Sequence, residues 1–475
     1  MSQHEEHGPS NNPAPSSSSN PAPSPNPTVP VPPSNPSYQI TPDAILAEIT
    51  SLSHKPVLLS QNLKSALPKE SRDAILARLL PGGQDPLGAL DVRTNTLGVL
   101  WILSARLMVH DAAPPPPHFI LDFCRYFDPE QAKLAPDRVT MLARGIERYG
   151  YKLNNVAWAI EPLYLLLTRY PPDLSYLTTI HPIFLLACVT SRHFSIALPI
   201  LQTPITNIDT HLSNLSYVDN LKYHYIGGIA LAALERWEEA EDFFQICVGS
   251  PAMVPSAIQL EALKKLWLVQ LIYRGKTSSL PRYVHQNLSR MLKNTAYQAL
   301  TNAYPHNLDH LQKLIEEHRQ LFSNEMNLGL VVHAFQRAPR WTLKKLTATY
   351  LTLSLADIAR EIKIDSQEQV RNMLLVMIEA KEISAKISAN GTVTFFDQPP
   401  QFSKQEVDRI LQQVQQQSEY LKHLDRELGK DKEYITKALK QKDEPGWGGG
   451  MVDDDLFSSA TGPGGQQWVD EPVYI

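Results

Sequence analysis

The clearest pattern of hydrophobic and polar positions lies in residues 341–397, where helical spacing gives way to strand spacing. Three segments carry apolar residues every three or four positions: 341–350, 355–362 and 367–381. Between residues 383 and 396 apolar and polar side chains alternate instead, on both sides of Asn390-Gly391. Three helices followed by a hairpin is the order of elements in a winged helix, a relative of the helix-turn-helix unit.

The second and third helices each have a polar residue positioned to start them. Ser354 precedes the second helix and is followed three residues later by Asp357, the spacing of a capping box. Asp365 and Ser366 can cap the third helix. Such side-chain oxygens accept hydrogen bonds from N–H groups that a first helical turn leaves unpaired, so they predict where both helices begin.

The register of the hairpin follows from which residues need burial. A two-residue loop at Asn390-Gly391 would turn the apolar residues of the return strand away from the core. A three-residue loop, with Gly391 in the left-handed conformation, keeps them on the buried face. This register predicts two cross-strand pairs: Ile387 with Val393, and Ala385 with Phe395.

The third helix would be the reading helix if this winged helix bound DNA. Its middle, residues 373–378, is apolar nearly all round, so we expect it to be buried. Its basic residues, Arg371 and Lys381, are offset by Glu368 and Glu379. Phosphate binding needs a cluster of Lys and Arg. The pattern favours a protein partner and no nucleic acid.

The hairpin also offers strand edges to a partner. An edge strand presents unpaired backbone groups, which a neighbouring chain can use to add a strand of its own. We expect the return strand of the hairpin, or a short strand near residue 352, to pair with or pack on another protein. The expected contact residues are Thr352, Thr392 and Thr394.

Between residues 41 and 326 the chain reads as a series of helices. Helical apolar spacing recurs in segments, several of them separated by Pro-rich or Gly-rich breaks: 59–67, 72–80, 94–109, 119–127, 154–170, 182–189, 256–273, 293–304 and 308–322. Strand signals are few. The pattern predicts an all-helical arm.

One stretch of this arm, residues 225–251, has the spacing of small and aromatic positions found in tetratricopeptide repeats. Gly227 and Gly228 let two helices approach closely, and Trp237 and Phe244 fill the groove between neighbours. Each repeat buries its face only on the next one. We therefore expect the arm to form one continuous core with the winged helix.

Residues 403–439 read as one long helix with an apolar stripe. The stripe residues lie on three- and four-residue spacing: Val407, Ile410, Val414, Leu421, Leu424, Leu428 and Ile435. This is a coiled-coil-like seam, and a monomer rarely leaves so many large aliphatic side chains in water. We expect the seam to enter a helical bundle shared with partners. The alternative is a helix that folds back along the arm.

Composition narrows the class of protein. A net charge of −5 and a pI near 6.3 give no signal for polyanion binding and suit a cytoplasmic and nuclear protein. The three cysteines, Cys124, Cys188 and Cys247, are far apart and read as reduced core thiols. The longest apolar run, 97–109, is too short to span a membrane, and no signal peptide is expected.

No motif for catalysis, a metal or a cofactor is present. The sequence lacks a phosphate-binding Gly-rich loop, HExxH and GxSxG. His306 and His310 stand four residues apart, but without a third ligand we interpret them as surface histidines. The acidic run at 238–242 is interpreted as a solvated helix face. We therefore expect a protein that is not an enzyme and holds no cofactor.

A helical-repeat arm followed by a winged helix and a terminal helix resembles the PCI family, named for the proteasome lid, the COP9 signalosome and the translation initiation factor three complex. The residues that carry the resemblance lie mainly between 225 and 397. They include Phe243-Phe244, Ser250-Pro251-Ala252-Met253, Leu260-Glu261-Ala262-Leu263-Lys264-Lys265, Leu280-Pro281-Arg282-Tyr283, Asn327-Leu328-Gly329-Leu330-Val331, Tyr350-Leu351-Thr352-Leu353-Ser354-Leu355 and Gly391-Thr392-Val393-Thr394-Phe395.

The resemblance implies a mainly α protein and a role as a non-catalytic scaffold of the signalosome. That complex removes Nedd8 from cullin–RING ubiquitin ligases, using a metal-dependent subunit whose His-x-His pair is absent here. The implied partners are other signalosome subunits, reached through the winged helix and the C-terminal helix, and cullin–RING ligases indirectly. A subunit of the proteasome lid is the first alternative, and a nucleic-acid adaptor or an independent enzyme is less favoured.

Together, pattern and resemblance divide the chain into five parts. These are a disordered Pro- and Ser-rich tail (1–39), a tetratricopeptide-like arm (40–326), a winged helix (327–397, which forms the PCI domain with the preceding helices from about 220), a C-terminal bundle helix (402–440) and a disordered acidic Gly-rich tail (443–475).

Overall fold

The computed structural model describes residues 41–65, 69–397 and 402–436. The chain forms two compact units, residues 1–342 and 343–475, and the boundary falls inside one helix, α18 (Leu328–Thr349). The two predicted tails, 1–39 and 443–475, lie outside the described residues. The fold is mainly helical, with a small sheet in the second unit, as the sequence predicts.

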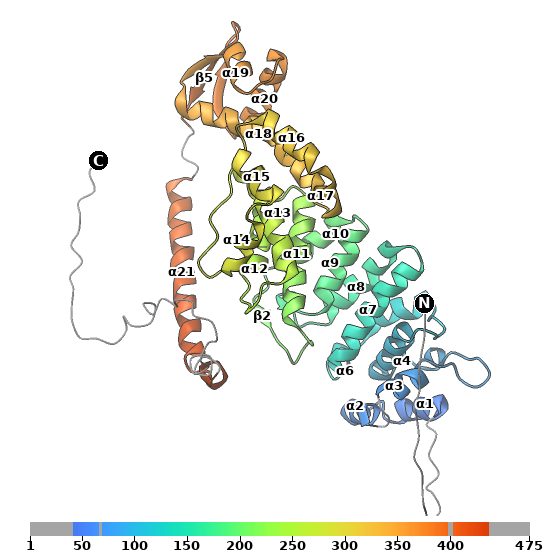
Figure 1. The fold of residues 1–475 in the computed structure, drawn as a ribbon. Coiled ribbons are helices and arrows are strands. Elements are labelled where there is room, and N and C mark those ends of the chain that lie inside the picture. Colours follow the sequence, from blue (N-terminus) through green and yellow to red (C-terminus); the bar gives the residue numbers. More distant parts are fainter. Residues whose placement is uncertain (1–40, 66–68, 398–401, 437–475) are drawn as a thin grey trace, which may run out of the picture. The chain divides into compact units, whose positions relative to one another are not determined.

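The first unit is an arm of helices that follow one another in chain order (Figure 1). Its first half contains α1 (Pro42–Ser51), α2 (Pro56–Ser65), α3 (Lys69–Leu76), η1 (Pro86–Ala89), α4 (Thr96–Met108), α5 (Pro117–Tyr126), α6 (Pro129–Ala132), α7 (Pro136–Lys152), η2 (Val156–Ala159), α8 (Ile160–Arg169), α9 (Ile180–Thr190) and α10 (Phe194–Leu201). Two short strands, β1 (Tyr176–Leu177) after α8 and β2 (Asn207–Ile208) after α10, pair with each other in parallel.

Its second half contains α11 (Tyr217–Ala233), α12 (Trp237–Gly249), α13 (Ala257–Arg274), α14 (Gln286–Leu292), α15 (Ala296–Ala303), α16 (Leu308–Glu317), α17 (Arg319–Asn324) and the start of α18. The helix predicted over 154–170 is divided into η2 and α8. The predicted series omits α1, α7 and α10.

The two glycines of the tetratricopeptide-like stretch allow α11 and α12 to pack closely. A Cβ atom added at Gly227 would lie 2.7 Å from the Phe243 ring, and one at Gly228 would lie 2.7 Å from the Phe244 ring. Phe244 is fully buried. The predicted role of the small residues in helix packing is therefore confirmed.

The prediction of one continuous core is wrong. The buried apolar side chains form two clusters, one in each unit. Within α18, Trp341 packs on the first cluster, and its Nε1–H donates to the Ile272 carbonyl at 3.2 Å. Leu343, two residues later, is buried in the second cluster. The winged helix has enough apolar residues of its own to form a separate core.

The acidic run of α12 is only partly a solvated face, which corrects the interpretation made from the sequence. Glu241 is buried and accepts hydrogen bonds from Arg274 Nε at 2.7 Å and Gln270 Nε2 at 3.0 Å, both on α13. It therefore holds α12 to α13. All three cysteines are free and buried, as predicted.

The second unit contains a winged helix whose elements match the predicted order. After α18 come β3 (Thr352–Ser354), α19 (Leu355–Glu361), α20 (Gln367–Glu379), β4 (Ser384–Ile387) and β5 (Thr392–Phe396). Both predicted caps are present, since Ser354 Oγ accepts from Asp357 N at 3.1 Å and Ser366 Oγ accepts from Gln369 N at 3.4 Å.

The hairpin has the predicted register. Ile387 pairs with Val393 and Ala385 with Phe395, and Gly391 has a φ of +79° in the loop. Val393 and Phe395 are buried in the core of this unit. The burial argument therefore selects the observed pairing.

The expectation that the middle of the third helix is buried is only partly right. Val370, Leu374 and Met377 of α20 are buried, but Leu375 and Val376 are exposed. A single helix packed on one side of a small core cannot bury its whole circumference. The helix is amphipathic, and its outer face carries Leu375 and Val376 among polar and charged side chains.

The C-terminal helix is shorter than predicted. Helix α21 (Lys404–Leu428) has Ser403 as its N-cap and ends at Leu428 instead of continuing to residue 439. Its 25 residues give a length of about 37 Å. Gly429 follows directly and lowers the helical propensity of the chain there.

Candidate partner interface

The small sheet has two edges, formed by β3 and β4, with β5 between them. Thr352, Leu353 and Ser354 of β3 pair with Thr394, Val393 and Thr392 of β5. The predicted contact residues of the winged helix therefore lie together on neighbouring strands. Only one of them, Thr352, is on an edge.

The hydrogen bonds between β3 and β5 fix the direction in which the backbone groups of β3 point. Phe395 N donates to Leu351 O at 2.8 Å, and Leu355 N donates to Gly391 O at 2.9 Å. These bonds flank Thr352 and Ser354, so both residues occupy positions whose own N–H and C=O groups face away from β5. Among the described residues no strand pairs with that side of β3.

The edge argument made from the sequence is wrong for the return strand. Thr392 and Thr394 belong to β5, which is paired on both sides. The sequence pattern identified the hairpin but could not show that β3, far away in the chain, covers its second side. Whether these two threonines contact a partner stays a prediction, but an added strand on β5 is excluded.

The second unit also exposes apolar side chains next to its strands in the sequence and on α20. Leu351, directly before Thr352, is 81% exposed. Phe396 at the end of β5 is also exposed, as are Leu375 and Val376 of α20. Sequence reasoning assigned none of these four to an interface. The signal was present in the apolar run of α20, which is longer than one buried helix face requires.

This surface of α20 is unlike a DNA-reading surface. A reading helix presents basic and polar side chains to the grooves and the phosphates. Here Leu375 and Val376 are exposed beside Arg371, and the exposed Glu368 and Glu379 offset the charge of that arginine. Lys386 is an exposed basic residue on β4. The chemistry of this face suits apolar contact with a protein.

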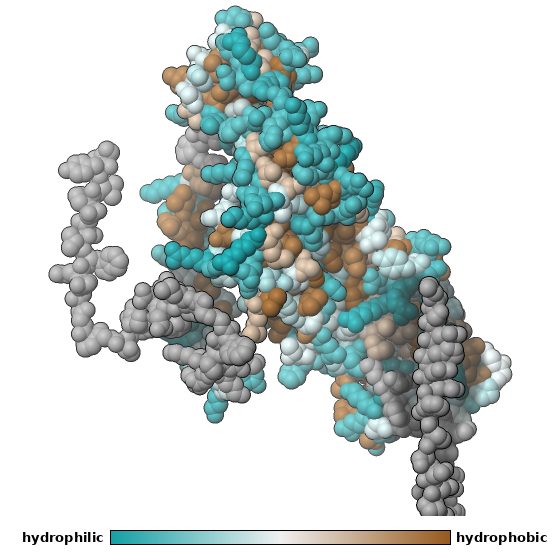
Figure 2. Space-filling view, viewed as in Figure 1, coloured by the Kyte–Doolittle hydropathy of each residue, from teal (hydrophilic) through white to brown (hydrophobic). Residues whose placement is uncertain are grey.

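Helix α21 carries six of the seven predicted seam residues. These are Val407, Ile410, Val414, Leu421, Leu424 and Leu428. All six are between 37% and 63% exposed, and Ile435, beyond the end of the helix, is exposed as well. Figure 2 shows hydrophobic side chains on the part of α21 that is in view. No described residue covers this stripe.

The start of α21 is fixed by local polar contacts. Ser403 Oγ accepts from Glu406 N at 3.3 Å, and the Glu406 carboxylate accepts from Ser403 N at 2.8 Å. The Ser403 backbone N–H and the Ser403 hydroxyl both donate to the Glu406 carboxylate at 2.8 Å, and these two hydrogen bonds lower the pKa of Glu406. The capping box therefore supports the first turn of a helix whose side chains are all exposed.

The described residues hold neither a metal-binding cluster nor a membrane-spanning helix. They contain no group of three or more His, Cys, Asp or Glu side chains arranged to hold a metal. None of the described helices has both the length and the apolar content needed to cross a membrane. The exposed apolar side chains of the second unit are thus the strongest candidate for a functional surface.

Comparison with known proteins agrees with this architecture. Residues 60–288 match the family described as COP9 signalosome complex subunit 3, N-terminal helical repeats, and residues 312–397 match the PCI domain. A protein of Dictyostelium discoideum named COP9 signalosome complex subunit 3 is 30% identical over 398 residues, covering 80% of this chain and 93% of its own length.

The chain belongs to the COP9 signalosome subunit 3 family. A second relative with the same name, from Drosophila melanogaster, is 28% identical over 402 residues, which are 78% of this chain and 89% of the relative. The PCI match ends with the hairpin at residue 397. The matched range includes β3, α20 and β5, so the open edge of β3 and the exposed Leu375 and Val376 of α20 lie within it.

Proposed function

We propose that the chain is a non-catalytic subunit of the COP9 signalosome, and that it joins the complex through the edge of β3 and the apolar stripe of α21. In this way it supports the removal of Nedd8 from cullin–RING ubiquitin ligases by another subunit. Cullin–RING ligases are then indirect partners. The proposed place of action is the cytoplasm and the nucleus.

The observation that carries this proposal is the exposed stripe of α21. Six large aliphatic side chains lie on one helix, and none of its residues is buried. Burying each one completely is worth about 1.5–3 kcal/mol. An isolated helix is only marginally stable in water, and within a protein most of a helix's stability comes from packing its apolar face. A bundle with helices of other subunits supplies that packing.

A subunit with this role needs no reactive group of its own. The relatives are named as signalosome subunits, which favours this complex over the proteasome lid. The absence of a His-x-His pair in the sequence agrees with a division of labour in which the metal-dependent chemistry lies elsewhere. The exposed apolar groups of α20 and α21 favour assembly over nucleic-acid binding.

The test is assembly of a truncated chain. A chain that ends at residue 401 lacks α21 and should keep the thermal melt of the arm and of the winged helix, because no described residue packs on the α21 stripe. It should fail to co-purify with the other signalosome subunits. Full incorporation of the truncated chain would contradict the proposal. So would deneddylase activity of the isolated full-length chain on a Nedd8–cullin substrate.

A further inference from the structure

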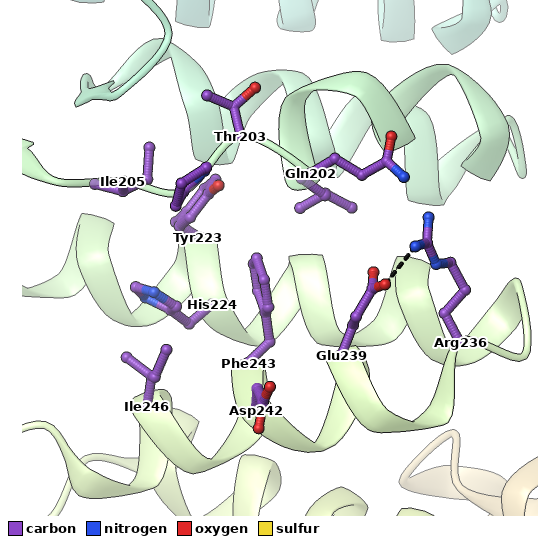
Figure 3. Close-up of a pocket in the computed structure, with 12 residues that line it drawn as sticks. Gln202, Thr203, Ile205, Tyr223, His224, Arg236, Glu239, Asp242, Phe243 and Ile246 are labelled. Atoms are coloured by element: carbon purple, nitrogen blue, oxygen red, sulfur yellow. Dashed lines mark hydrogen bonds and ion pairs between the residues drawn. The ribbon is translucent and has the colours of Figure 1, made fainter. Parts of the chain in front are cut away.

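A cavity of about 540 Å³ lies in the middle of the arm, between the segment after α10 and helices α11 and α12 (Figure 3). This volume is in the usual range for binding pockets. Its lining comes from three places in the chain: Thr203 and Ile205 after α10, Tyr223 and His224 on α11, and Arg236, Glu239, Asp242 and Phe243 at the start of α12 and along it. None of them belongs to the proposed assembly surface.

One wall of the cavity is aromatic and uncharged. The Phe243 ring lies 5.7 Å from the Tyr223 ring and 5.4 Å from the His224 ring, measured between centroids. Burial lowers the pKa of His224, so its imidazole is neutral near pH 7. Figure 3 shows Phe243 standing between Tyr223 and Glu239. A flat or aliphatic group can therefore lie against this wall.

One polar atom at this wall has no partner. Tyr223 is 1% exposed, and its hydroxyl makes no hydrogen bond to any described residue. Other buried tyrosines of the arm are satisfied, since Tyr170 donates to Leu212 O at 2.6 Å and Tyr304 donates to Ala334 O at 3.0 Å. Buried hydroxyls are normally hydrogen-bonded. The Tyr223 hydroxyl is thus an unsatisfied polar group below the wall of the cavity, on the side of Thr203 in Figure 3, and a bound group reaches it when the side chains over it move.

The rim of the cavity has an unmatched negative charge. Arg236 pairs with Glu239, and Arg274 pairs with Glu241 at 2.7 Å. Asp242 makes no hydrogen bond or ion pair with the described residues, although it lies between these acids on the same helix. Burial, together with Glu241 and Glu238, raises the pKa of Asp242, and the charge of Arg274 offsets this only in part. A cation placed at Asp242 would relieve this crowding of like charges.

We propose that this cavity binds an extended peptide segment of a partner protein that presents a basic side chain beside an apolar residue. The basic group pairs with Asp242, and its stem or the neighbouring apolar side chain covers Phe243. A cation near an aromatic face gains a further electrostatic attraction. A polar group of the same peptide meets the Tyr223 hydroxyl. Charge complementarity selects this occupant over an acidic peptide, which Asp242 would repel.

The experiment uses the full-length chain and two fluorescein-labelled hexapeptides, Gly-Leu-Arg-Leu-Arg-Gly and the same peptide with citrulline in place of both arginines. Citrulline keeps the shape of arginine and removes its charge. Fluorescence anisotropy should show the arginine peptide binding at least tenfold more tightly than the citrulline peptide. Asp242→Asn should remove most of that difference. Asp111→Asn, which removes an exposed charge outside the cavity, should leave it unchanged.

Tyr223→Phe separates binding from folding. Its hydroxyl has no partner in the free chain, so the variant should melt at or above the temperature of the unmodified chain and still bind the arginine peptide severalfold more weakly. Tyr304→Phe, which loses a made hydrogen bond, should melt lower and bind normally.

Three results would overturn the proposal. The first is failure of the arginine peptide to bind saturably. The second is equal affinity of the two peptides, which would assign the cavity to an apolar occupant. The third is a dimer of the full-length chain that Phe243→Ala dissolves, which would assign the cavity to a second copy. Asp242→Asn should enter the signalosome normally, so these outcomes are independent of the proposed assembly role.

Discussion

Thr352 and Thr394 face each other across β3 and β5, yet their backbone N–H groups point in opposite directions. Thr352 directs its N–H to the open side of the sheet, as the flanking bonds of Leu351 and Leu355 require. Thr394 directs its N–H to β4. In the ladder between β4 and β5, Ser388 N donates to Thr392 O at 2.8 Å. Hydrogen-bonded pairs occur at every second position of an antiparallel ladder, so Thr394 and Lys386 also form a hydrogen-bonded pair.

This difference predicts that proline has opposite effects at the two positions. Thr352→Pro removes a donor that the chain itself does not use, so it should leave the thermal melt nearly unchanged and weaken co-purification with other signalosome subunits. Thr394→Pro removes a ladder bond in the central strand and should cost at least about 1 kcal/mol of unfolding free energy. Normal co-purification of a folded Thr352→Pro chain would exclude strand addition at β3.

The glycines of the arm predict a second pair of opposite effects. Gly228→Ala places a Cβ atom 2.7 Å from the buried Phe244 ring, so it should lower the unfolding free energy by about 1–3 kcal/mol through overpacking. Gly329→Ala, in the first turn of α18, meets nothing within 4 Å and should stabilise the chain by about 0.4–1 kcal/mol. Urea denaturation followed by circular dichroism measures both. Equal effects of the two substitutions would show that α11 and α12 are not in close contact.

The local features of the winged helix could be predicted because each depends on residues close together in the chain. Ser354 and Ser366 cap helices through N–H groups three residues away, and Gly391 sets the hairpin loop by its own φ. What could not be predicted depends on distant partners. The position of β5 between two strands requires Thr352, 42 residues before Thr394.

The same limit explains the corrections in the arm and on the candidate interface. Glu241 reads as one acid in a solvated run, and its burial is revealed only by Arg274, 33 residues later. The exposure of Leu375 depends on which face of α20 meets the core. The sequence could not show which face this is, because residues 373–378 are apolar nearly all round the helix. The stripe of α21 was predictable because the periodicity of one helix defines it.

A buried histidine of the arm predicts how stability depends on pH. His181 is 0% exposed, its Nδ1 accepts from Thr178 N at 3.0 Å, and its Nε2 has no partner among the described residues. Burial lowers the pKa of His181 from 6.5 to about 4. The folded state therefore favours the neutral ring. This contribution to stability is complete above the unfolded-state pKa and is lost as the pH falls from 6.5 toward 4.

We expect His181 to account for a loss of about 2 kcal/mol between pH 7 and pH 5, at 1.36 kcal/mol for each pKa unit. His181→Asn keeps an acceptor near the Nδ1 position and does not titrate, so urea denaturation of this variant should vary less with pH. Some dependence should remain, since the pKa of the buried His224 is also lowered. An identical pH dependence in His181→Asn and the unmodified chain would show that another group controls it.

The last prediction concerns single charges in the stripe of α21. Leu421 and Leu424 are exposed in the chain alone, so Leu421→Asp or Leu424→Asp should leave its thermal melt unchanged. In a shared bundle each aspartate would be buried without a partner, a position that charged groups strongly disfavour. Each substitution should therefore strongly reduce co-purification with other signalosome subunits. Gln416→Asp adds the same charge to the same helix away from the stripe, and it should assemble normally.

If all three variants assembled equally well, the stripe would not be the contact. If either leucine variant melted at a lower temperature, the stripe would be packing on its own chain, and the loss of assembly would follow from misfolding.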